Sequence, residues 1–116
     1  MNDGEDKVII NLREMFGYSF LGARYDGEQV RKLEDEIILQ NKKKVVLNFE
    51  GITAISHGFA DEIVGIYARA FGVDFIKQNI RVINATEVVR SMLNVAIQVS
   101  VKYQSNIDKK DSKNQK

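Results

Sequence analysis

Three short apolar runs, each rich in β-branched residues, alternate with three longer segments of helical spacing. The runs are residues 7–12 (KVIINL), 45–49 (VVLNF) and 80–83 (IRVI). β-Branched side chains favour extended backbone because their χ1 angles are restricted. A repeated strand–helix order requires right-handed crossovers between strands that are at least partly parallel. The sequence therefore predicts an α/β protein with a small, mixed, partly parallel sheet and three helices.

The segment that follows residue 56 has the clearest helical pattern. Apolar residues recur there every three or four positions, which places them on one face of an α-helix. They are Phe59, Ile63, Ile66, Tyr67, Ala70 and Phe71. Ser56 precedes this pattern where an N-cap residue belongs, and Gly72 follows it as a C-cap. We expect this helix to cover the sheet with its apolar face.

A helix is also predicted between the first two runs. Asp26 is its expected N-cap and forms a capping-box pattern with Gln29. Its core face contains Val30, Leu33 and Ile37. Its other faces carry charged residues: Glu28, Arg31, Lys32, Glu34 and Asp35. The basic run 42–44 follows this helix, and cations there complement the negative end of the helix dipole.

The third helix is predicted to begin at Asn84, with Glu87 three residues later. Its core face follows the same spacing and contains Val89, Met92, Leu93, Ala96, Ile97 and Val101. Because the pattern stops after Tyr103, we expect one domain, residues 7–103, and a disordered polar tail, residues 104–116. Residues 16–23 (FGYSFLGA) are compatible with either an edge strand or a loop.

The composition excludes several classes of function and location. The chain has no cysteine, which excludes disulfides, thiolate metal sites and cysteine nucleophiles and favours a reducing compartment. A net charge of +1 gives no basis for general attraction to nucleic acid or to an anionic membrane. The acidic start of the chain differs from a signal peptide, and no apolar run approaches the roughly 20 residues that span a bilayer. We expect a cytoplasmic protein.

The connection at residues 54–62 (AISHGFADE) resembles a known family. With VVLNFEGI before it, this connection is similar to the STAS domain of bacterial anti-sigma factor antagonists. The similarity is closer to a divergent STAS-like family of uncharacterised function, which RYDG at 24–27 and IRVIN at 80–84 also resemble, and it covers residues 7–100. The order and spacing of these segments carry the resemblance.

The resemblance implies a phosphorylation switch. In STAS antagonists, a partner that is both kinase and anti-sigma factor phosphorylates a hydroxyl in this connection, and the phosphorylated form releases the partner. Ser56 matches that hydroxyl and Gly58 matches the family glycine, whereas Ile55 and His57 replace an Asp and a second hydroxyl. The unpaired N–H groups of a helix start can accept a phosphate. The resemblance therefore makes Ser56 the candidate phospho-acceptor, with a simple N-cap as the alternative role of this residue.

The expected partner-binding residues lie in the connection and the helix start. They are Ser56, His57, Gly58, Asp61 and Glu62. Asp61 and Glu62 are predicted to be surface charges that complement the helix dipole and repel a phosphate on Ser56. Adjacent helical positions are about 100° apart, so these carboxylates are not expected to converge. His57 is expected to face solvent or a partner, because adjacent side chains on an extended segment point to opposite sides and His57 cannot easily deprotonate Ser56.

These features predict a protein–protein interaction module that docks a kinase- or ATPase-type regulator. No local motif supplies a catalytic triad, a metal site or a glycine-rich nucleotide loop, so neither enzyme activity nor a metal or cofactor is expected. Two alternatives stay open. One is a structural subunit or homodimer that uses the same helix without a phosphate switch, and the other is a small-ligand or nucleotide-binding domain.

Overall fold

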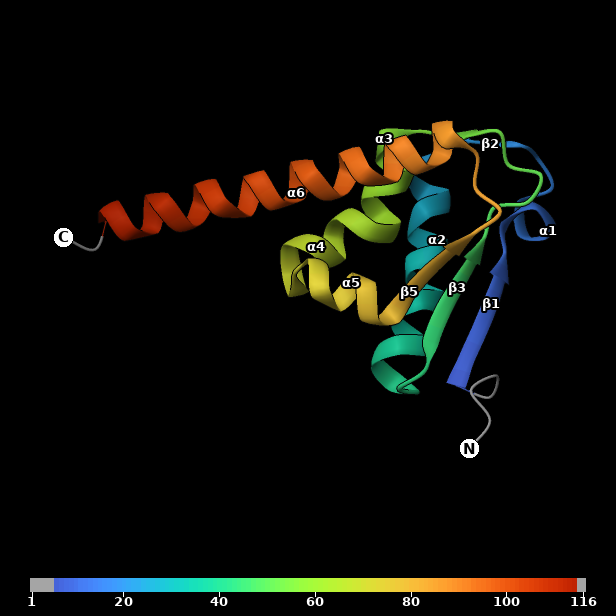
Figure 1. Cartoon of the computed structure of the whole chain (residues 1–116), viewed down its shortest axis with the longest axis horizontal. Helices are drawn as coiled ribbons and strands as arrows, with labels where there is room; N and C mark the ends of the chain where they lie inside the picture. The colour runs from blue at the N-terminus through green and yellow to red at the C-terminus, as the bar shows by residue number, and fades with distance from the viewer. Residues whose placement is uncertain (1–5, 115–116) are drawn as a thin grey trace.

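The computed structural model describes the backbone of residues 6–114 and the side chains of residues 6–107. Its central sheet has the strand order β1–β3–β5, formed by β1 (Lys7–Asn11), β3 (Lys44–Asn48) and β5 (Ile80–Ile83) (Figure 1). A smaller sheet pairs β2 (Phe20–Leu21) with β4 (Ala54–Ile55). The predicted α/β class is confirmed, and both described sheets are wholly parallel. Residues 16–23 thus contain a short strand.

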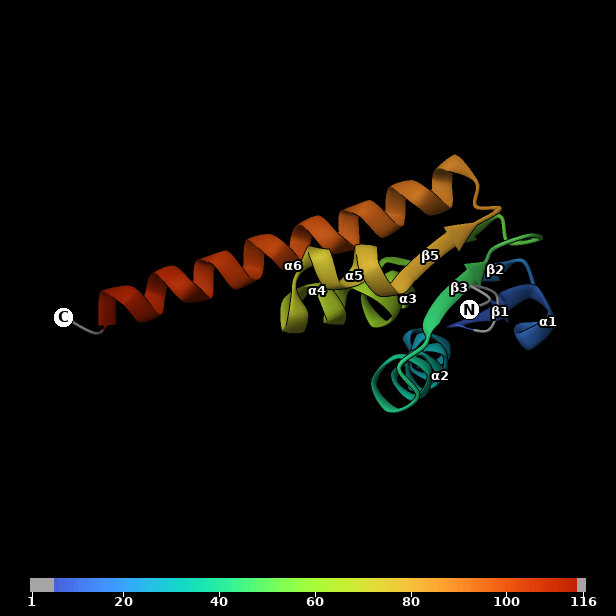
Figure 2. The same cartoon turned by 60° about the horizontal axis from the view of Figure 1, so that its bottom comes forward.

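Three helical segments correspond to the predicted helices. The first is α2 (Arg24–Asp35), which continues as the π-helical turn η2 (Glu36–Gln40). The second comprises α3 (His57–Ala60), the π-helical turn η3 (Asp61–Gly65) and α4 (Ile66–Phe71). The third is the long helix α6 (Glu87–Asn114), and Figure 2 shows these helices from a second direction. Two short helices, α1 (Leu12–Phe16) and α5 (Val73–Asn79), add to the predicted three.

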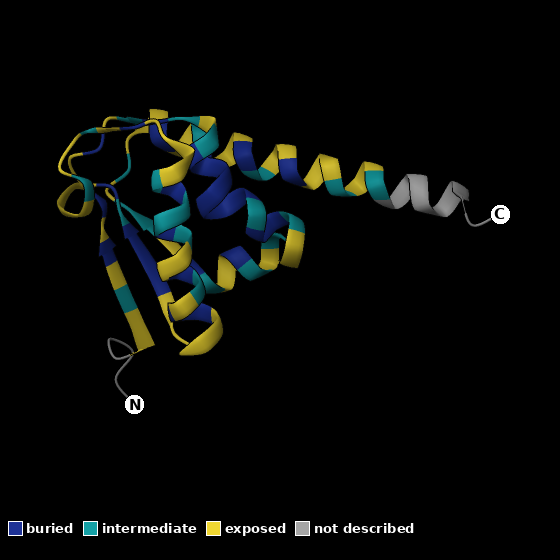
Figure 3. Cartoon of the chain, turned by 180° about the vertical axis from the view of Figure 1, so that it is seen from behind, coloured by how far each residue is buried: buried dark blue, intermediate teal, exposed yellow. Residues whose placement is uncertain are grey.

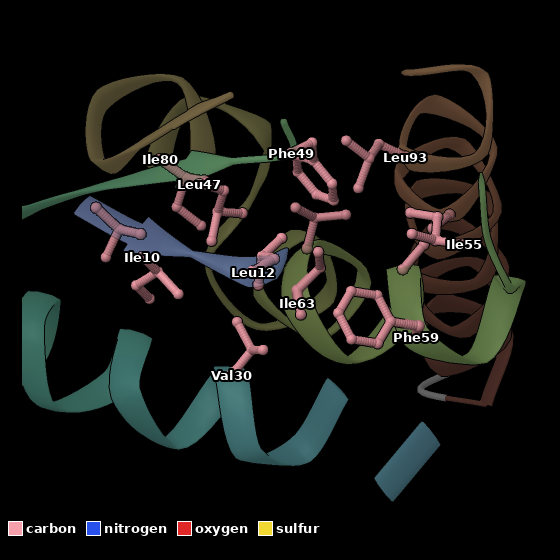
Figure 4. Close-up of a cluster of buried hydrophobic side chains, with 14 of the residues drawn as sticks. Ile10, Leu12, Val30, Leu47, Phe49, Ile55, Phe59, Ile63, Ile80 and Leu93 are labelled. Atoms are coloured by element: carbon pink, nitrogen blue, oxygen red, sulfur yellow. The ribbon is translucent and has the colours of Figure 1, made fainter. Parts of the chain in front are cut away.

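The core lies between the sheet and these helices. Ile10 and Leu47 from the sheet meet Val30 of α2 and Ile63 of η3 in one buried cluster (Figure 4). The turn η3 contacts both α2 and α6, so it lies at the centre of the helical layer. Figure 3 shows this central position as a continuous buried segment.

The predicted starts of two helices are wrong. Helix α2 begins at Arg24, and Asp26 lies in its first turn, where its carboxylate accepts a hydrogen bond from Tyr18. Asn84 has a left-handed backbone (φ 57°) and ends the preceding strand. Helix α6 is capped instead by Thr86, whose Oγ1 accepts the N–H of Val89 at 3.1 Å. Helix α2 follows Ala23 and has no side-chain cap, and two polar residues, Asn84 and Thr86, precede α6, so the sequence alone does not identify the capping residue.

The predicted core faces also need correction. Leu33 and Val101 are 37% and 41% exposed, whereas Glu34 and Ser100 are fully buried. The buried stripe of α6 runs through Val89, Leu93, Ala96 and Ser100. Glu34 was predicted to lie on the charged face, and a carboxylate is seldom fully buried. Ser100 lies close to the buried charges of η3 that are described below, because its Oγ accepts a hydrogen bond from Arg69.

Helix α6 continues past the predicted end of the domain. Its backbone is helical to Asn114, where the sequence predicted a disordered tail from residue 104, and its final part projects beyond the other helices (Figure 1). Residues 115–116 of the predicted tail lie outside the described residues. Within the described range, no helix is both long and apolar enough to cross a membrane.

Two glycines allow η3 to approach its neighbours closely. A Cβ atom at Gly27 of α2 would lie 2.8 Å from Cβ of Glu62. A Cβ atom at Gly65 would lie 2.3 Å from Oδ1 of Asp61 and 3.0 Å from Oγ of Ser100 on α6. The distances of 2.8 Å at Gly27 and 2.3 Å at Gly65 are shorter than real contacts of a Cβ atom, so neither position has room for a larger side chain.

We predict that Gly65→Ala destabilises the protein despite the higher helix propensity of alanine. The added methyl group overpacks the contact with Asp61 and lowers the free energy of unfolding by about 1–3 kcal/mol. Gly58→Ala is the matched control, because a Cβ there meets Arg24 at an ordinary 3.5 Å. That variant should be neutral or more stable by up to about 1 kcal/mol. Equal Tm values for the two variants in a thermal melt would contradict the close packing of η3.

Candidate functional site

The connection between β4 and α3 positions Ser56 at a helix start. Its Oγ accepts the backbone N–H of Phe59 at 3.0 Å, as predicted for an N-cap. Its own N–H donates to the carbonyl oxygen of Leu21 at 2.9 Å, which ties the connection to β2. The preceding Ile55 is buried in the core. The backbone of this connection is therefore held on both sides of Ser56.

The segment Ser56–His57–Gly58, called the Ser56 turn below, reaches the surface. Ser56 and Gly58 are half-buried and His57 is exposed. A Cβ atom at Gly58 would lie 3.5 Å from Nε of Arg24, so this guanidinium lies beside the turn. The side chain of Arg24 is half exposed, at 51%. The turn therefore combines a hydroxyl, an imidazole and a guanidinium at one helix start.

Asp61 and Glu62 are not surface charges as predicted. They are only 7% and 5% exposed and form a buried acidic pair in η3. Arg24 approaches both carboxylates, with Nη1 2.9 Å from Asp61 Oδ2 and 2.8 Å from Glu62 Oε2. The two carboxylates thus share one cation, although they were not expected to converge. They cannot serve as freely exposed partner contacts.

Two more arginines complete the neutralisation of the acidic pair. Nε of Arg31, on α2, lies 3.0 Å from Glu62 Oε1. Nη1 of Arg69, on α4, lies 2.7 Å from Asp61 Oδ1 and donates to Oγ of Ser100 at 2.8 Å. Burial alone would raise the pKa of Asp61, but hydrogen bonds from Arg69 and Arg24 outweigh it and hold this pKa below its ordinary value. These contacts join α2, η3, α4 and α6.

Glu34 is a second buried carboxyl, and it lacks such partners. It is fully buried, and neither of its side-chain oxygens has a hydrogen-bond partner among the described residues. Burial raises its pKa well above the ordinary value, and the neighbouring charge of Asp35 raises it further. The hydroxyl of Tyr67 lies near Glu34, but it donates its hydrogen bond to Asp35 and not to Glu34. Burial thus favours the protonated form of Glu34.

A hollow of about 360 Å³ opens beside the Ser56 turn. It is lined by His57, Asp61 and Arg69 on one side and by Val99 and Tyr103 of α6 on the other. Val99 and Tyr103 are 48% and 57% exposed. Sequence reasoning missed both residues: it did not assign Val99 to a face and treated Tyr103 as the end of the helix.

These two residues belong to a longer apolar stripe on α6. Its members follow one another at intervals of three or four residues, one position away from the buried stripe. They are Val88, Met92, Val95, Val99 and Tyr103, and all are exposed except the half-buried Met92. Exposed and buried segments alternate along α6 (Figure 3). The signal was present in the sequence, but only the packed structure shows which of the two stripes faces the core.

The carboxyl ends of the sheet strands carry a ladder of asparagines. Nδ2 of Asn48 donates to Oδ1 of Asn11 at 2.9 Å, and Nδ2 of Asn84 donates to Oδ1 of Asn48 at 3.0 Å. This edge is where open α/β sheets generally bind ligands. Here the side-chain amides of the three asparagines largely satisfy one another's hydrogen bonds. Among the residues that the structure describes, no group of three or more His, Asp or Glu side chains could hold a metal ion.

Comparison with protein families finds one match. The model of a family described as a STAS-like domain of unknown function matches residues 26–90, which is more than half of the 116-residue chain. The match includes the Ser56 turn, the acidic pair, Arg31 and Arg69, whereas Arg24 lies two residues before it. Neither the curated proteins nor the solved structures contain a match.

We predict that Glu34→Met stabilises the protein at neutral and higher pH. A raised pKa in the folded state means that Glu34 costs least below the ordinary glutamate pKa of 4.5 and most once the pH exceeds the raised value. Methionine has a similar volume and needs no hydrogen bond. The gain should be roughly 1–3 kcal/mol at about pH 8 and should shrink toward about pH 5.

Chemical denaturation at the two pH values measures this difference. Glu36→Met replaces an exposed carboxylate on the same helical segment and is the control, with an expected change of less than about 0.5 kcal/mol. A Glu34→Met protein that is less stable than the wild type at about pH 8 would show that Glu34 has a stabilising partner.

Proposed function

Since this chain belongs to the family of STAS-like domains of unknown function, we propose that it is an interaction module that docks a protein partner through the Ser56 turn. One observation carries the proposal. The exposed His57 and the exposed apolar residues Val99 and Tyr103 line the same hollow. The proposed setting is regulation in the cytoplasm. The resemblance to anti-sigma factor antagonists suggests a kinase- or ATPase-type regulator as the partner.

The composition of this surface supports docking. Contiguous exposed apolar groups next to polar ones are typical of interaction sites, and tyrosine is enriched among residues that dominate binding energy. The hollow offers an aromatic ring, a valine and an imidazole, with the Arg69 guanidinium at its base. A partner side chain that enters the hollow would contact α3 and α6 together. In this proposal Asp61 and Glu62 hold the turn in place and do not bind the partner.

The same geometry supports a phosphorylation switch at Ser56. A phosphate on its Oγ would add a charge of about −1.5 to −2 next to the N–H groups at the start of α3. Arg24 lies beside the turn and could pair with it. The sequence predicted repulsion from Asp61 and Glu62, but their three arginines offset it. The added charge and bulk would instead act on the partner's side of the interface.

A homodimer is the second candidate, and the α6 stripe favours it. Five residues with intervals of three and four are the pattern by which helices pair along a seam. A second copy placed along this stripe would cover Val88, Val95 and Val99. It would use the same hollow without a need for phosphate. The two candidates therefore compete for one surface.

The experiment places a photo-crosslinking amino acid at position 57 of the full chain in its native cells. We predict one specific heterologous adduct with wild-type Ser56 and with Ser56→Ala, and a yield at least about ten-fold lower with Ser56→Asp. Ser105→Asp is the matched control, because it adds a similar charge at an exposed site outside the turn and should leave the yield unchanged.

Three other outcomes would change the conclusion. Equal yields with Ser56→Ala and Ser56→Asp would exclude the switch and leave the docking surface. Adducts only between two copies of the chain would favour the homodimer. Specific adducts from a crosslinker at the exposed position 32, and none from position 57, would exclude the Ser56 turn as the docking site.

A further inference from the structure

A second hollow, of about 190 Å³, lies where the strands of the central sheet begin. Four cationic residues from four different elements line it: Lys7 of β1, Lys44 of β3, Lys77 of α5 and Arg81 of β5. All four are exposed. The three strands are parallel and run in the same direction (Figures 1 and 2). Since this basic hollow is lined by residues where they begin, it lies at the end of the sheet opposite to the strand ends that lead toward the Ser56 turn.

The strand register places three of these cations together on one face. Lys7 is directly opposite Lys44, and Val46 is directly opposite Arg81. Lys44 and Val46 are two residues apart on β3, so they share a face. Like charges directly opposite each other destabilise a sheet. The sheet therefore holds a Lys–Lys pair and a diagonal arginine in an arrangement that folding alone does not favour.

Among the residues that the structure describes, no acidic side chain lines the basic hollow. In the described part of the chain, none of its four cations forms an ion pair, whereas Arg24, Arg31 and Arg69 all do. Lys77 lies in the last turn of α5, where a cation also complements the helix dipole. Lys7, Lys44 and Arg81 have no such compensation. Four charges in one hollow far exceed the net charge of +1 of the whole chain.

The size of the hollow limits what can bind. Its 190 Å³ correspond to about six water molecules at ~30 Å³ each. Sites for drug-sized ligands usually occupy about 300–1,000 Å³. The hollow can therefore enclose a short chain of phosphoryl groups but not an attached nucleoside. Gln78 and Asn79 add two polar residues to its lining, and Val45, Val46 and Ile80 add apolar ones.

We propose that the basic hollow is a binding site for the polyphosphate group of a small molecule. Lysine and arginine are the side chains that proteins use for phosphate, and a polyvalent anion would relieve the repulsion between Lys7 and Lys44. Free polyphosphate and a nucleoside triphosphate share this chemistry. The basic hollow shares no lining residue with the hollow beside the Ser56 turn. Polyphosphate binding and partner docking can therefore be tested, and can fail, independently of each other.

Calorimetric titration of the full chain with inorganic tripolyphosphate tests this site. We expect saturable binding of one molecule per chain that weakens with added salt. Lys44→Gln and Arg81→Gln should each weaken binding by roughly ten-fold. Lys102→Gln removes an exposed lysine from α6 and should leave the affinity unchanged. The Tm of ligand-free Lys44→Gln should equal or exceed that of the wild type, which separates binding from a structural role.

Parallel titrations distinguish the ligand classes. ATP that binds as tightly as tripolyphosphate supports recognition of the phosphate chain within a nucleotide, and much weaker ATP binding supports free polyphosphate. The proposal is overturned if tripolyphosphate does not saturate the chain at millimolar concentration in low salt, or if Lys102→Gln weakens binding as much as Lys44→Gln. It is also overturned if a single-stranded oligonucleotide or a polyglutamate peptide binds more tightly than tripolyphosphate and loses affinity with the same variants.

Discussion

The buried acidic pair, Asp61 and Glu62, is the feature on which the helical layer depends. Removing a carboxylate from water costs several kcal/mol, so two adjacent ones are tolerated only with close cationic partners. Arg24 and Arg31 reach the pair from α2 and Arg69 reaches it from α4. Because these contacts bridge separate helices, they fix how α2 packs on η3. The buried charges define a particular packing arrangement where an apolar contact would allow several.

This arrangement gives neighbouring residues different roles. Asp61 and Glu62 are buried and hold η3 against α2 and α4, while Ser56 and His57 form the start of α3 at the surface. Arg24 belongs to both groups, since it neutralises the pair and lies beside the Ser56 turn. A phosphate on Ser56 would compete with the acidic pair for this guanidinium. The proposed switch would thereby act on the packing of α2 as well as on the partner.

The sequence predicted what short-range chemistry determines. β-Branched runs gave the three strands of the main sheet, and the local hydrogen bond of Ser56 made its N-cap recognisable. The burial of Asp61 and Glu62 was missed because it depends on arginines that are distant in the sequence. The exposed stripe of α6 was missed for a related reason: two adjacent apolar stripes on one helix are equivalent until the other helices select one for the core. The basic hollow likewise depends on strand register, which brings Lys7 and Lys44 together across 37 positions.

Amide hydrogen exchange in an Arg24→Gln variant tests most directly whether the charge network holds the Ser56 turn. Loss of the shared cation leaves the acidic pair partly unneutralised and should increase local opening around it. We expect the amides of Phe59 and Ala60, which bond to Ser56, to exchange at least about ten-fold faster than in the wild type, while those of β3 keep their rates. Unchanged exchange at Phe59 and Ala60 would contradict the account, and so would an equal acceleration in β3.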